Sequence, residues 1–473
     1  MDAVATRHTE PLEHVDARTK LAYGFGAVAY GIKDNGFSVF LLIFYQQVIG
    51  LDAGLVGLML LLALVADALI DPLIGHLSDR TRSRWGRRHP WMYASAVPIA
   101  LLWIAVWNPP DWGEAGQLGY LLVTAIGVRA SLAAYEVPSI ALTPEMTRDY
   151  HERTSILGWR YLFGWVGGLT MLALAYGVFL HPEPGFPDGL LNANGYSRFA
   201  VVGAVGMAVA VLVSAVGTHR RFARPPAVRD THVPGLGAMF AAFRFRPFLM
   251  LMSAVLFSFT AQGLNFALSN YMLLYVWQIP QSLLIVYAAA LFGGVALAMV
   301  LAQLAGRRWG KPFGAALLAA MGAVLASAPY WLFVAEVVTD ATTMAVLAPL
   351  LATFGLATAF GVGAMILGAS MLADVTDASW EETGRREEGL FFAGYFFLQK
   401  CVTGLGIFLS GLILKVVAFP DKAVPGAVPR PILSELALIF AVVVLLTGLL
   451  AAWRLSRFPL KPPDPTEPID LIT

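Results

Sequence analysis

The chain has 473 residues, of which 58% are hydrophobic and 13% are charged, whereas a soluble domain carries about 25% charged residues. Its formal net charge of +1 provides no basic field for nucleic acid, so we expect no nucleic-acid partner. The single cysteine, Cys401, excludes an intramolecular disulfide and a cysteine-based metal site.

The apolar residues form many runs of about 18 to 28 residues, each long enough to cross a ~30 Å hydrocarbon core as a helix. Residues 1–21 are polar, lack the apolar core of a secretory signal and are predicted to form a short cytoplasmic tail. The sequence therefore predicts an all-α membrane protein. In chain order, the predicted spans are residues 22–48, 54–78, 91–108, 117–142, 155–181, 197–218, 247–277, 282–304, 313–335, 343–371, 391–418 and 433–454.

A Pro- and Arg-rich connection over residues 219–246 separates two predicted six-helix bundles. The basic turn Arg84-Trp85-Gly86-Arg87 follows the second span, and Arg308-Trp309-Gly310-Lys311 follows the eighth. Matching turns at matching places indicate a duplication of six helices. The predicted units are therefore bundles over 22–218 and 247–454, the central loop, and cytoplasmic tails over 1–21 and 455–473.

Basic residues predict the orientation of the spans, because Lys and Arg are retained on the cytoplasmic side. One alternate set of connections is rich in Arg, including Arg80, Arg82, Arg220 and Arg307. Five of the six connections on the other side contain no Lys or Arg. We therefore expect a multi-pass protein of the bacterial inner membrane with both termini in the cytoplasm.

Two carboxylates, Asp67 and Asp71, lie in the middle of the second predicted span. Their i,i+4 spacing places them on one helical face. When two carboxylates lie this close together in a low dielectric, either a cation sits between them or one of them binds a proton. The pair is therefore a candidate site for a coupling ion, and a structural salt bridge is the alternative. Arg129 lies in the fourth span at a similar depth, where its guanidinium is placed to pair with these acids.

Further charges interrupt the predicted spans, and charged groups inside a membrane are candidates for function because their burial is costly. Carboxylates that face a cavity accept hydrogen bonds from hydroxyl groups, and cationic groups donate several, which suits a polyol. For Arg160, near the start of the fifth span, snorkelling to the interface is an equal alternative. The candidate substrate-binding residues are Lys33, Asp34, Glu136, Arg160 and Lys400.

Mixed charges follow the fourth and tenth predicted spans, and we expect these stretches to lie in cytoplasmic connections. Such charges are suited to ion pairs that close a cytoplasmic gate between the two halves, and a solvated loop is the alternative for each residue. The candidate gate residues are Glu145, Arg148, Arg153, Asp374 and Asp377.

Several motifs together resemble the glycoside–pentoside–hexuronide:cation symporters of the major facilitator superfamily. They are Lys33-Asp34, the stretch Asp67-Ala-Leu-Ile-Asp71-Pro72-Leu-Ile-Gly75 with its basic turn, Glu136-Val-Pro138, Leu142-Thr-Pro-Glu145-Met-Thr, and Ala373-Asp374 with Lys400. The resemblance extends over essentially the whole chain. It implies a major facilitator fold of twelve helices in two six-helix halves that expose a shared cavity alternately to each side.

By the same resemblance, Asp67 and Asp71 fall on the family's cation-site acids, and they would be the metal ligands if sodium is the coupling ion. Asp34 and Glu136 fall on its sugar-binding acids, and Lys33, Arg160 and Lys400 line the same cavity. Two features depart from the best-known member: Ala133 replaces a hydroxyl residue associated with sodium, and Arg129 replaces a small neutral residue.

These departures favour H+ over Na+ as the coupling ion, with no other cofactor. We expect a symporter for a sugar, glycoside or uronide that works as a monomer in the lipid bilayer. One alternative is a sugar uniporter in which Arg129 replaces the coupling cation, and another is a transporter of lysophospholipids or other amphiphiles. No His-rich cluster or nucleophile–base pair in the sequence indicates an enzyme.

Overall fold

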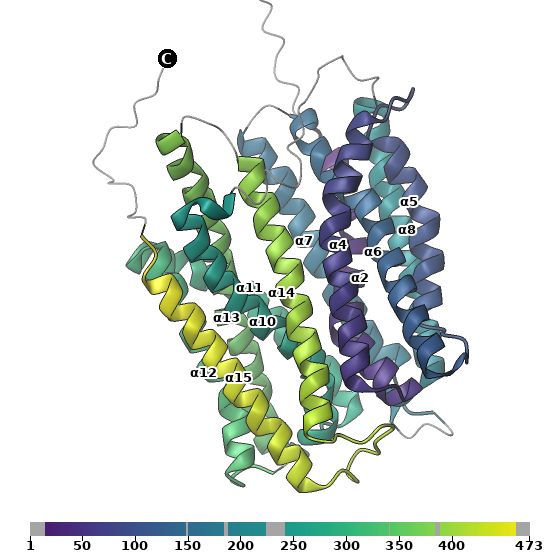
Figure 1. The fold of residues 1–473 in the computed structure, drawn as a ribbon, viewed down its shortest axis with the longest axis vertical. Helices are drawn as coiled ribbons and strands as arrows, with labels where there is room; N and C mark the ends of the chain where they lie inside the picture. Colours follow the sequence, from purple (N-terminus) through teal and green to yellow (C-terminus); the bar gives the residue numbers. More distant parts are fainter. Residues whose placement is uncertain are drawn as a thin grey trace, which may run out of the picture.

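The computed structural model describes residues 15–147, 150–183, 188–223, 242–339, 341–383 and 388–459. Within these ranges, twelve helices are long and apolar enough to cross a bilayer. They form two bundles that lie side by side (Figure 1). The predicted all-helical fold and the predicted count of twelve spans are thereby confirmed.

The first half contains six spans in chain order. The first span is α1 (Ala17–Phe25), α2 (Ala27–Asn35), the π-helical η1 (Gly36–Phe40), α3 (Leu41–Ile43) and the π-helical η2 (Phe44–Ile49). The others are α4 (Ala53–Arg80), α5 (His89–Val106), α6 (Gly113–Met146), α7 (Tyr150–Leu174) with η3 (Ala175–Phe179), and α8 (Ala193–Phe222).

The second half repeats this order of six spans, and its described residues contain one π-helical segment where those of the first half contain three. Its spans are α10 (Arg246–Tyr271) with η6 (Met272–Val276), α11 (Leu284–Trp309), α12 (Lys311–Val334), α13 (Met344–Thr383), α14 (Glu388–Val416) and α15 (Arg430–Ser456). Short 3-10 turns lie in connections at Gly189–Leu191, Ala242–Arg244 and Gln281–Leu283.

Helix boundaries differ from the sequence-based ones at two places that matter. The first span begins at Ala17, inside the predicted tail. The tenth span continues to Thr383, so Asp374 and Asp377 lie on a helix, and the prediction that they lie in a connection was wrong. Charged residues mark where a helix leaves the apolar layer, but they do not end it, because its backbone hydrogen bonds form equally well in water.

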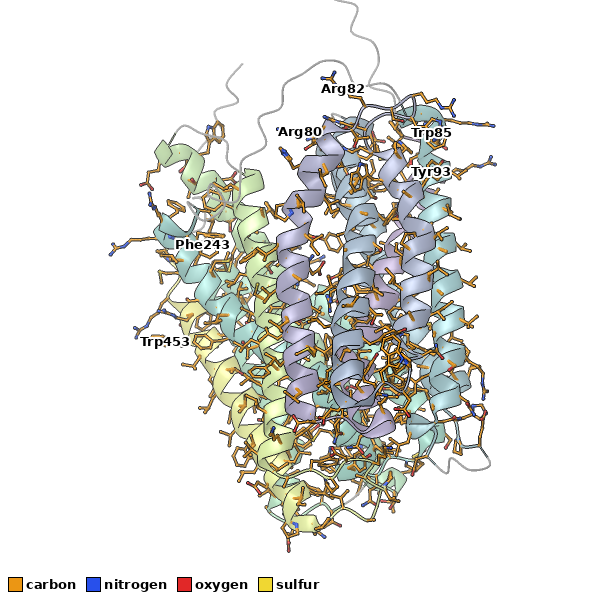
Figure 2. The ribbon with its side chains drawn as sticks, turned by 45° about the vertical axis from the view of Figure 1, so that its right-hand side comes forward. Arg80, Arg82, Trp85, Tyr93, Phe243 and Trp453 are labelled. Atoms are coloured by element: carbon orange, nitrogen blue, oxygen red, sulfur yellow. The ribbon has the colours of Figure 1, made fainter. Side chains whose placement is uncertain are left out.

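The two ends of the molecule differ in composition. We call the end that carries residues 80–89, 222–223 and 309–311 the basic end, and Figure 2 shows Arg80 and Arg82 there. The distal end carries the described parts of the other connections, which are residues 50–52, 107–112, 180–183, 188–192, 277–283, 335–339, 341–343 and 417–429. Within the described ranges, every ion pair at the basic end joins two residues of one half.

The halves meet through three helix pairs: α4 with α14, the first span with α10, and α7 with α11. The α4–α14 pair is packed backbone to backbone near the distal end. A Cβ atom added to Gly411 would lie 2.2 Å from the carbonyl oxygen of Ala53. A glycine at this position is therefore what lets the two helices approach so closely.

Candidate functional site

A charged cluster lies between the halves at the middle of α4 and α14. Asp67 and Asp71 stand one turn apart on α4, and Lys400 reaches them from α14. The Lys400 Nζ atom lies 2.5 Å from Asp71 Oδ2 and 3.1 Å from Asp67 Oδ2. One ammonium group of the second half therefore bridges both carboxylates of the first half.

Arg129 joins this cluster from α6. Its Nη1 atom donates to Asp67 Oδ2 at 3.3 Å, and both side chains are buried. The Arg129 guanidinium also lies over the ring of Phe37, 5.1 Å from its centroid. Its Nε atom has no hydrogen-bond partner among the residues that the structure describes. Arg129 thus pairs with one of the two acids, and Lys400 is the group that contacts both.

A second charged group lies on α6 and α7. Arg160 Nη1 donates to Ser139 Oγ at 2.7 Å, and Arg160 Nη2 lies 3.4 Å from Glu136 Oε1. The Arg160 side chain is 7% exposed and that of Glu136 is 25% exposed. Burial to this degree excludes snorkelling to the interface for Arg160 in this state. Glu136 keeps part of its carboxylate accessible.

Lys33 and Asp34 lie on α2 in the middle of the first span. Lys33 is buried, with its Nζ atom 4.5 Å from the ring centroid of Tyr30 and 3.6 Å from Asp34 Oδ1. The Asp34 side chain is 42% exposed. Of the eight predicted cation-coupling and substrate-binding residues, Asp34 is therefore the one most accessible to a ligand.

A small cavity of about 10 Å³ lies at the meeting point of these groups. It is lined by Tyr30, Lys33, Asp67, Asp71, Arg129, Leu132, Ala133, Glu136 and Lys400. This volume is roughly what one water molecule needs. Six of the eight predicted cation-coupling and substrate-binding residues thus line this cavity, and the other two, Arg160 and Asp34, join them through ion pairs with Glu136 and Lys33.

Hydrogen bonds between the halves gather at the distal end, around two neighbouring glutamines in η2. Gln47 Oε1 accepts from Tyr275 Oη at 3.1 Å and from the Ala423 backbone N–H at 2.7 Å, and its Nε2 donates to the Pro420 carbonyl at 2.9 Å. Gln46 accepts from Tyr271 Oη and donates to Asp421 Oδ1, both at 2.8 Å. Nearby, Lys415 Nζ lies 3.0 Å from Asp52 Oδ2. We call these contacts the distal latch.

Aromatic packing holds the latch glutamines in place. Phe44 lies three residues before Gln47 and packs against Trp107, with 5.3 Å between ring centroids, and against Tyr196, at 4.7 Å. The rings of Trp107 and Tyr196 stack on each other at 5.6 Å. This end of the first span is therefore anchored in the first half, and its glutamines reach across to the second.

The four predicted gate residues that the structure describes lie at the basic end but do not bridge the halves. Glu145 pairs with Arg87 at 2.6 Å, and Lys311 pairs with Asp374 at 2.6 Å, in each case within one half. Arg153 donates to the Thr147 carbonyl at 3.0 Å. Asp377 is exposed and forms no ion pair with any residue in the described ranges, and Arg148 lies outside them. Among the described residues, the expected pairs across the gate are thus not formed in this state.

A family model for MFS/sugar transport proteins matches residues 22–462 of the chain. The chain belongs to this family. It is a membrane transporter of the major facilitator type and not an enzyme. This confirms the resemblance to glycoside–pentoside–hexuronide:cation symporters that the sequence motifs carry.

Three relatives of this MFS/sugar transport protein extend over most of its length. The "Uncharacterized symporter sll1374" of Synechocystis is 29% identical over 90% of each chain. The "Glucuronide carrier protein homolog" of Escherichia coli is 26% identical over 85% of this chain and 86% of its own. The "Sodium-dependent lysophosphatidylcholine symporter 1" of Gallus gallus is 25% identical over 88% of this chain and 82% of its own.

The distal latch is the part of this transporter that the sequence did not reveal. Gln46 and Gln47 are uncharged, and they lie at the end of an apolar span where polar residues are common. Two adjacent amides before the Gly50 turn were the available signal. Their partners lie more than 220 residues away in the chain, and hydropathy does not indicate such pairing.

Proposed function

We propose that this protein is a symporter that moves a sugar, glycoside or uronide together with a cation, with H+ favoured over Na+. The basic end faces the cytoplasm, as the distribution of Lys and Arg favours, so the distal end faces outward. The distal latch holds the outward side closed while no ion pair among the described residues joins the halves at the basic end. This is the arrangement of a carrier that is open toward the cytoplasm.

The observation that carries the proposal is the bridge from Lys400 to Asp67 and Asp71. The two carboxylates belong to one half and the ammonium group to the other, so the cluster reports on how the halves are placed. Asp67 and Asp71 are balanced by Arg129 and Lys400. With two fixed cations for two acids, the formal charge is cancelled, and a sodium ion has no uncompensated carboxylate to bind.

In this proposal a proton can take the place of Lys400 at the Asp71 carboxylate, whereas a sodium ion cannot. Protonation of Asp71 removes one negative charge, and the ammonium group of Lys400 is then released from that carboxylate. Asp67 remains paired with Arg129 at 3.3 Å. The proton therefore loosens a contact between the halves without leaving an unpaired acid. By linkage, a substrate that favours the released arrangement raises the affinity for the proton by the same factor.

The substrate site in this proposal is formed by Asp34 and Glu136, with Arg160 and Lys33 beside them. Asp34 and Glu136 keep accessible carboxylate area, with side chains 42% and 25% exposed. A carboxylate accepts two hydroxyl hydrogen bonds at once. The name of the glucuronide carrier relative supports a hydroxyl-rich substrate.

The test is thermal unfolding of the purified protein with sugars, glycosides, uronides and lysophospholipids, at two pH values and with Na+ or K+. A ligand at a hundred times its dissociation constant adds about 2.7 kcal/mol to the free energy of unfolding. We expect a stabilising sugar or glycoside whose effect depends on pH and not on Na+. The stabilisation by the sugar should be lost in Asp34→Asn and in Glu136→Gln. Its dependence on pH should be lost in Asp71→Asn.

An amphiphile is the second candidate substrate, and the lysophosphatidylcholine symporter among the relatives is the observation that favours it. Stabilisation by lysophospholipids, with all sugars inert, would overturn the saccharide proposal. A response to Na+ that matches the response to H+ would overturn the preference for the proton.

A further inference from the structure

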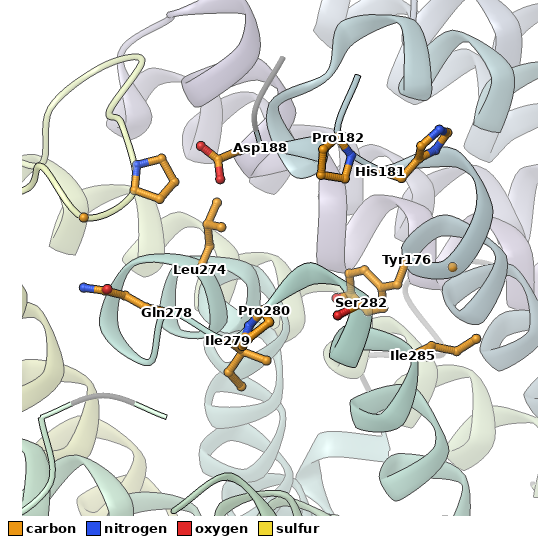
Figure 3. Close-up of a pocket in the computed structure, with 13 residues that line it drawn as sticks. Tyr176, His181, Pro182, Asp188, Leu274, Gln278, Ile279, Pro280, Ser282 and Ile285 are labelled. Atoms are coloured by element: carbon orange, nitrogen blue, oxygen red, sulfur yellow. The ribbon is translucent and has the colours of Figure 1, made fainter. Parts of the chain in front are cut away.

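A larger cavity lies at the distal end, away from the charged cluster. Its volume is about 780 Å³, within the range of about 300 to 1,000 Å³ that is usual for small-molecule sites. Figure 3 shows its walls. Tyr176, His181 and Asp188 come from the first half, and Leu274, Gln278 and Ser282 come from the second. Gln278 and His181 are exposed, so solvent reaches the cavity.

The walls combine hydrogen-bonding groups with apolar surface. The polar groups are the carboxylate of Asp188, the amide of Gln278, the imidazole of His181 and the hydroxyl of Ser282. Leu274, Ile279, Pro280 and Ile285 supply the apolar part. The described residues of the lining include no Lys or Arg, so an anionic ligand would meet a carboxylate without a fixed cation among them to offset it. A neutral ligand with hydroxyl donors and an apolar face fits these walls.

Asp188 and Gln278 are set up for such a ligand. Among the described residues no side chain or backbone group donates a hydrogen bond to the Asp188 carboxylate, and burial raises the pKa of Asp188. Gln278 adopts a left-handed backbone conformation with φ of 48°, which is strained for a residue other than glycine. Strain of this kind gathers at ligand sites, and Gln278 lies in the wall of the cavity.

We propose that this cavity is a second binding site, on the outward side, for a neutral glycoside with an apolar aglycone, and that its occupation holds the distal end closed. The choice of a glycoside rests on the proposed function, whereas the site itself rests on the lining residues. The walls belong to both halves, so separation of the halves at this end pulls the site apart. A ligand that binds only the assembled site shifts the equilibrium toward the closed state.

The ligand part of the test uses the full-length protein with Glu136→Gln, which disables the proposed central site. Two probes are titrated by calorimetry: 4-nitrophenyl β-glucoside, which is neutral, and 4-nitrophenyl β-glucuronide, which is anionic. We expect saturable binding of the glucoside only. Asp188→Asn and Gln278→Ala should each weaken it about tenfold, because the first replaces a carboxylate acceptor by a neutral amide and the second removes an amide from the wall. Gln117→Ala is the matched control, since its amide lies at the same end but outside the cavity.

The conformational part uses spin labels on two exposed distal positions, Asp111→Cys in the first half and Val337→Cys in the second, with Cys401→Ala. Addition of the glucoside should shift the distribution of distances between the two labels toward the shorter distances of the closed state. Asp188→Asn should abolish this shift.

Several results would overturn the second site. They are binding that disappears with Glu136→Gln alone, binding that is unchanged in both Asp188→Asn and Gln278→Ala, and equal binding of the glucuronide. The first of these leaves the proposed central site intact, so the two proposals fail separately. Saturable binding of a 4-nitrophenyl-linked amine in place of the glucoside would overturn the ligand class.

Discussion

Replacement of Gln47 by Ala should open the distal end of the transporter. The Gln47 side chain makes three hydrogen bonds to the second half, at 2.7, 2.9 and 3.1 Å. When the halves separate, water satisfies these groups, so each bond contributes its net value of about 1 kcal/mol to closure. Their loss shifts the equilibrium by about 3 kcal/mol, which is more than a hundredfold in the ratio of closed to open protein.

Double electron–electron resonance between labels at Asp111→Cys and Val337→Cys measures this ratio directly. We expect one short distance in the parent protein and a major longer distance after Gln47→Ala. Gln117→Ala is the control, because its amide donates to the Pro110 carbonyl within the first half, at 3.3 Å. An unchanged distance distribution in Gln47→Ala would refute the reasoning, as would an equal change in the control.

Two further predictions concern charge. Arg129→Gly should make Na+ raise the melting temperature, because it removes the cation that pairs with Asp67 and leaves Lys400 to balance two acids. Arg129→Lys should behave like the parent, and an unchanged ion response in Arg129→Gly would contradict the charge balance. At the distal end, burial acts to raise the pKa of Asp52, but the Leu55 backbone N–H and Lys415 outweigh it and hold the pKa below its ordinary value. The contribution of Asp52 to stability is therefore complete above the pKa of about 3.9 that the group has in an unfolded chain and is lost as the pH falls through the lower value. Melting curves against pH should show this acid loss in the parent protein and not in Asp52→Asn.

Much of the fold follows from the sequence because the bilayer imposes a simple rule. An apolar run of sufficient length must be a helix, and the Arg-rich turns separate such runs. The same rule predicts the ends of the helices poorly. Asp374 and Asp377 were assigned to a connection since they are charged, yet α13 continues to Thr383, and Lys311 pairs with Asp374 at its side.

The charged residues could be found from the sequence, and so could the pairing of Arg129 with an acid of the second span, but the pairing of Lys400 could not. Depth in a span selects Asp67, Asp71, Arg129 and Lys400 as unusual. That Lys400 faces the span-two acids, 329 residues away in the chain, depends on how the two halves pack. Hydropathy says nothing about that packing. The distal latch was missed for the same reason, with the additional difficulty that its glutamines carry no charge.

The chemistry of the distal latch has a consequence for the surroundings in which the carrier works. Most of its bonds join amides, phenols and backbone groups, with Asp421 and the Asp52–Lys415 pair as the charged members. Bonds between neutral groups are hardly screened by dissolved ions, whereas exposed ion pairs stabilise less as the salt concentration rises. The basic end relies on ion pairs such as Arg87–Glu145. In the proposed orientation, the largely salt-insensitive closure faces the medium, where ionic strength varies, and the salt-sensitive contacts face the cytoplasm, where the cell regulates it.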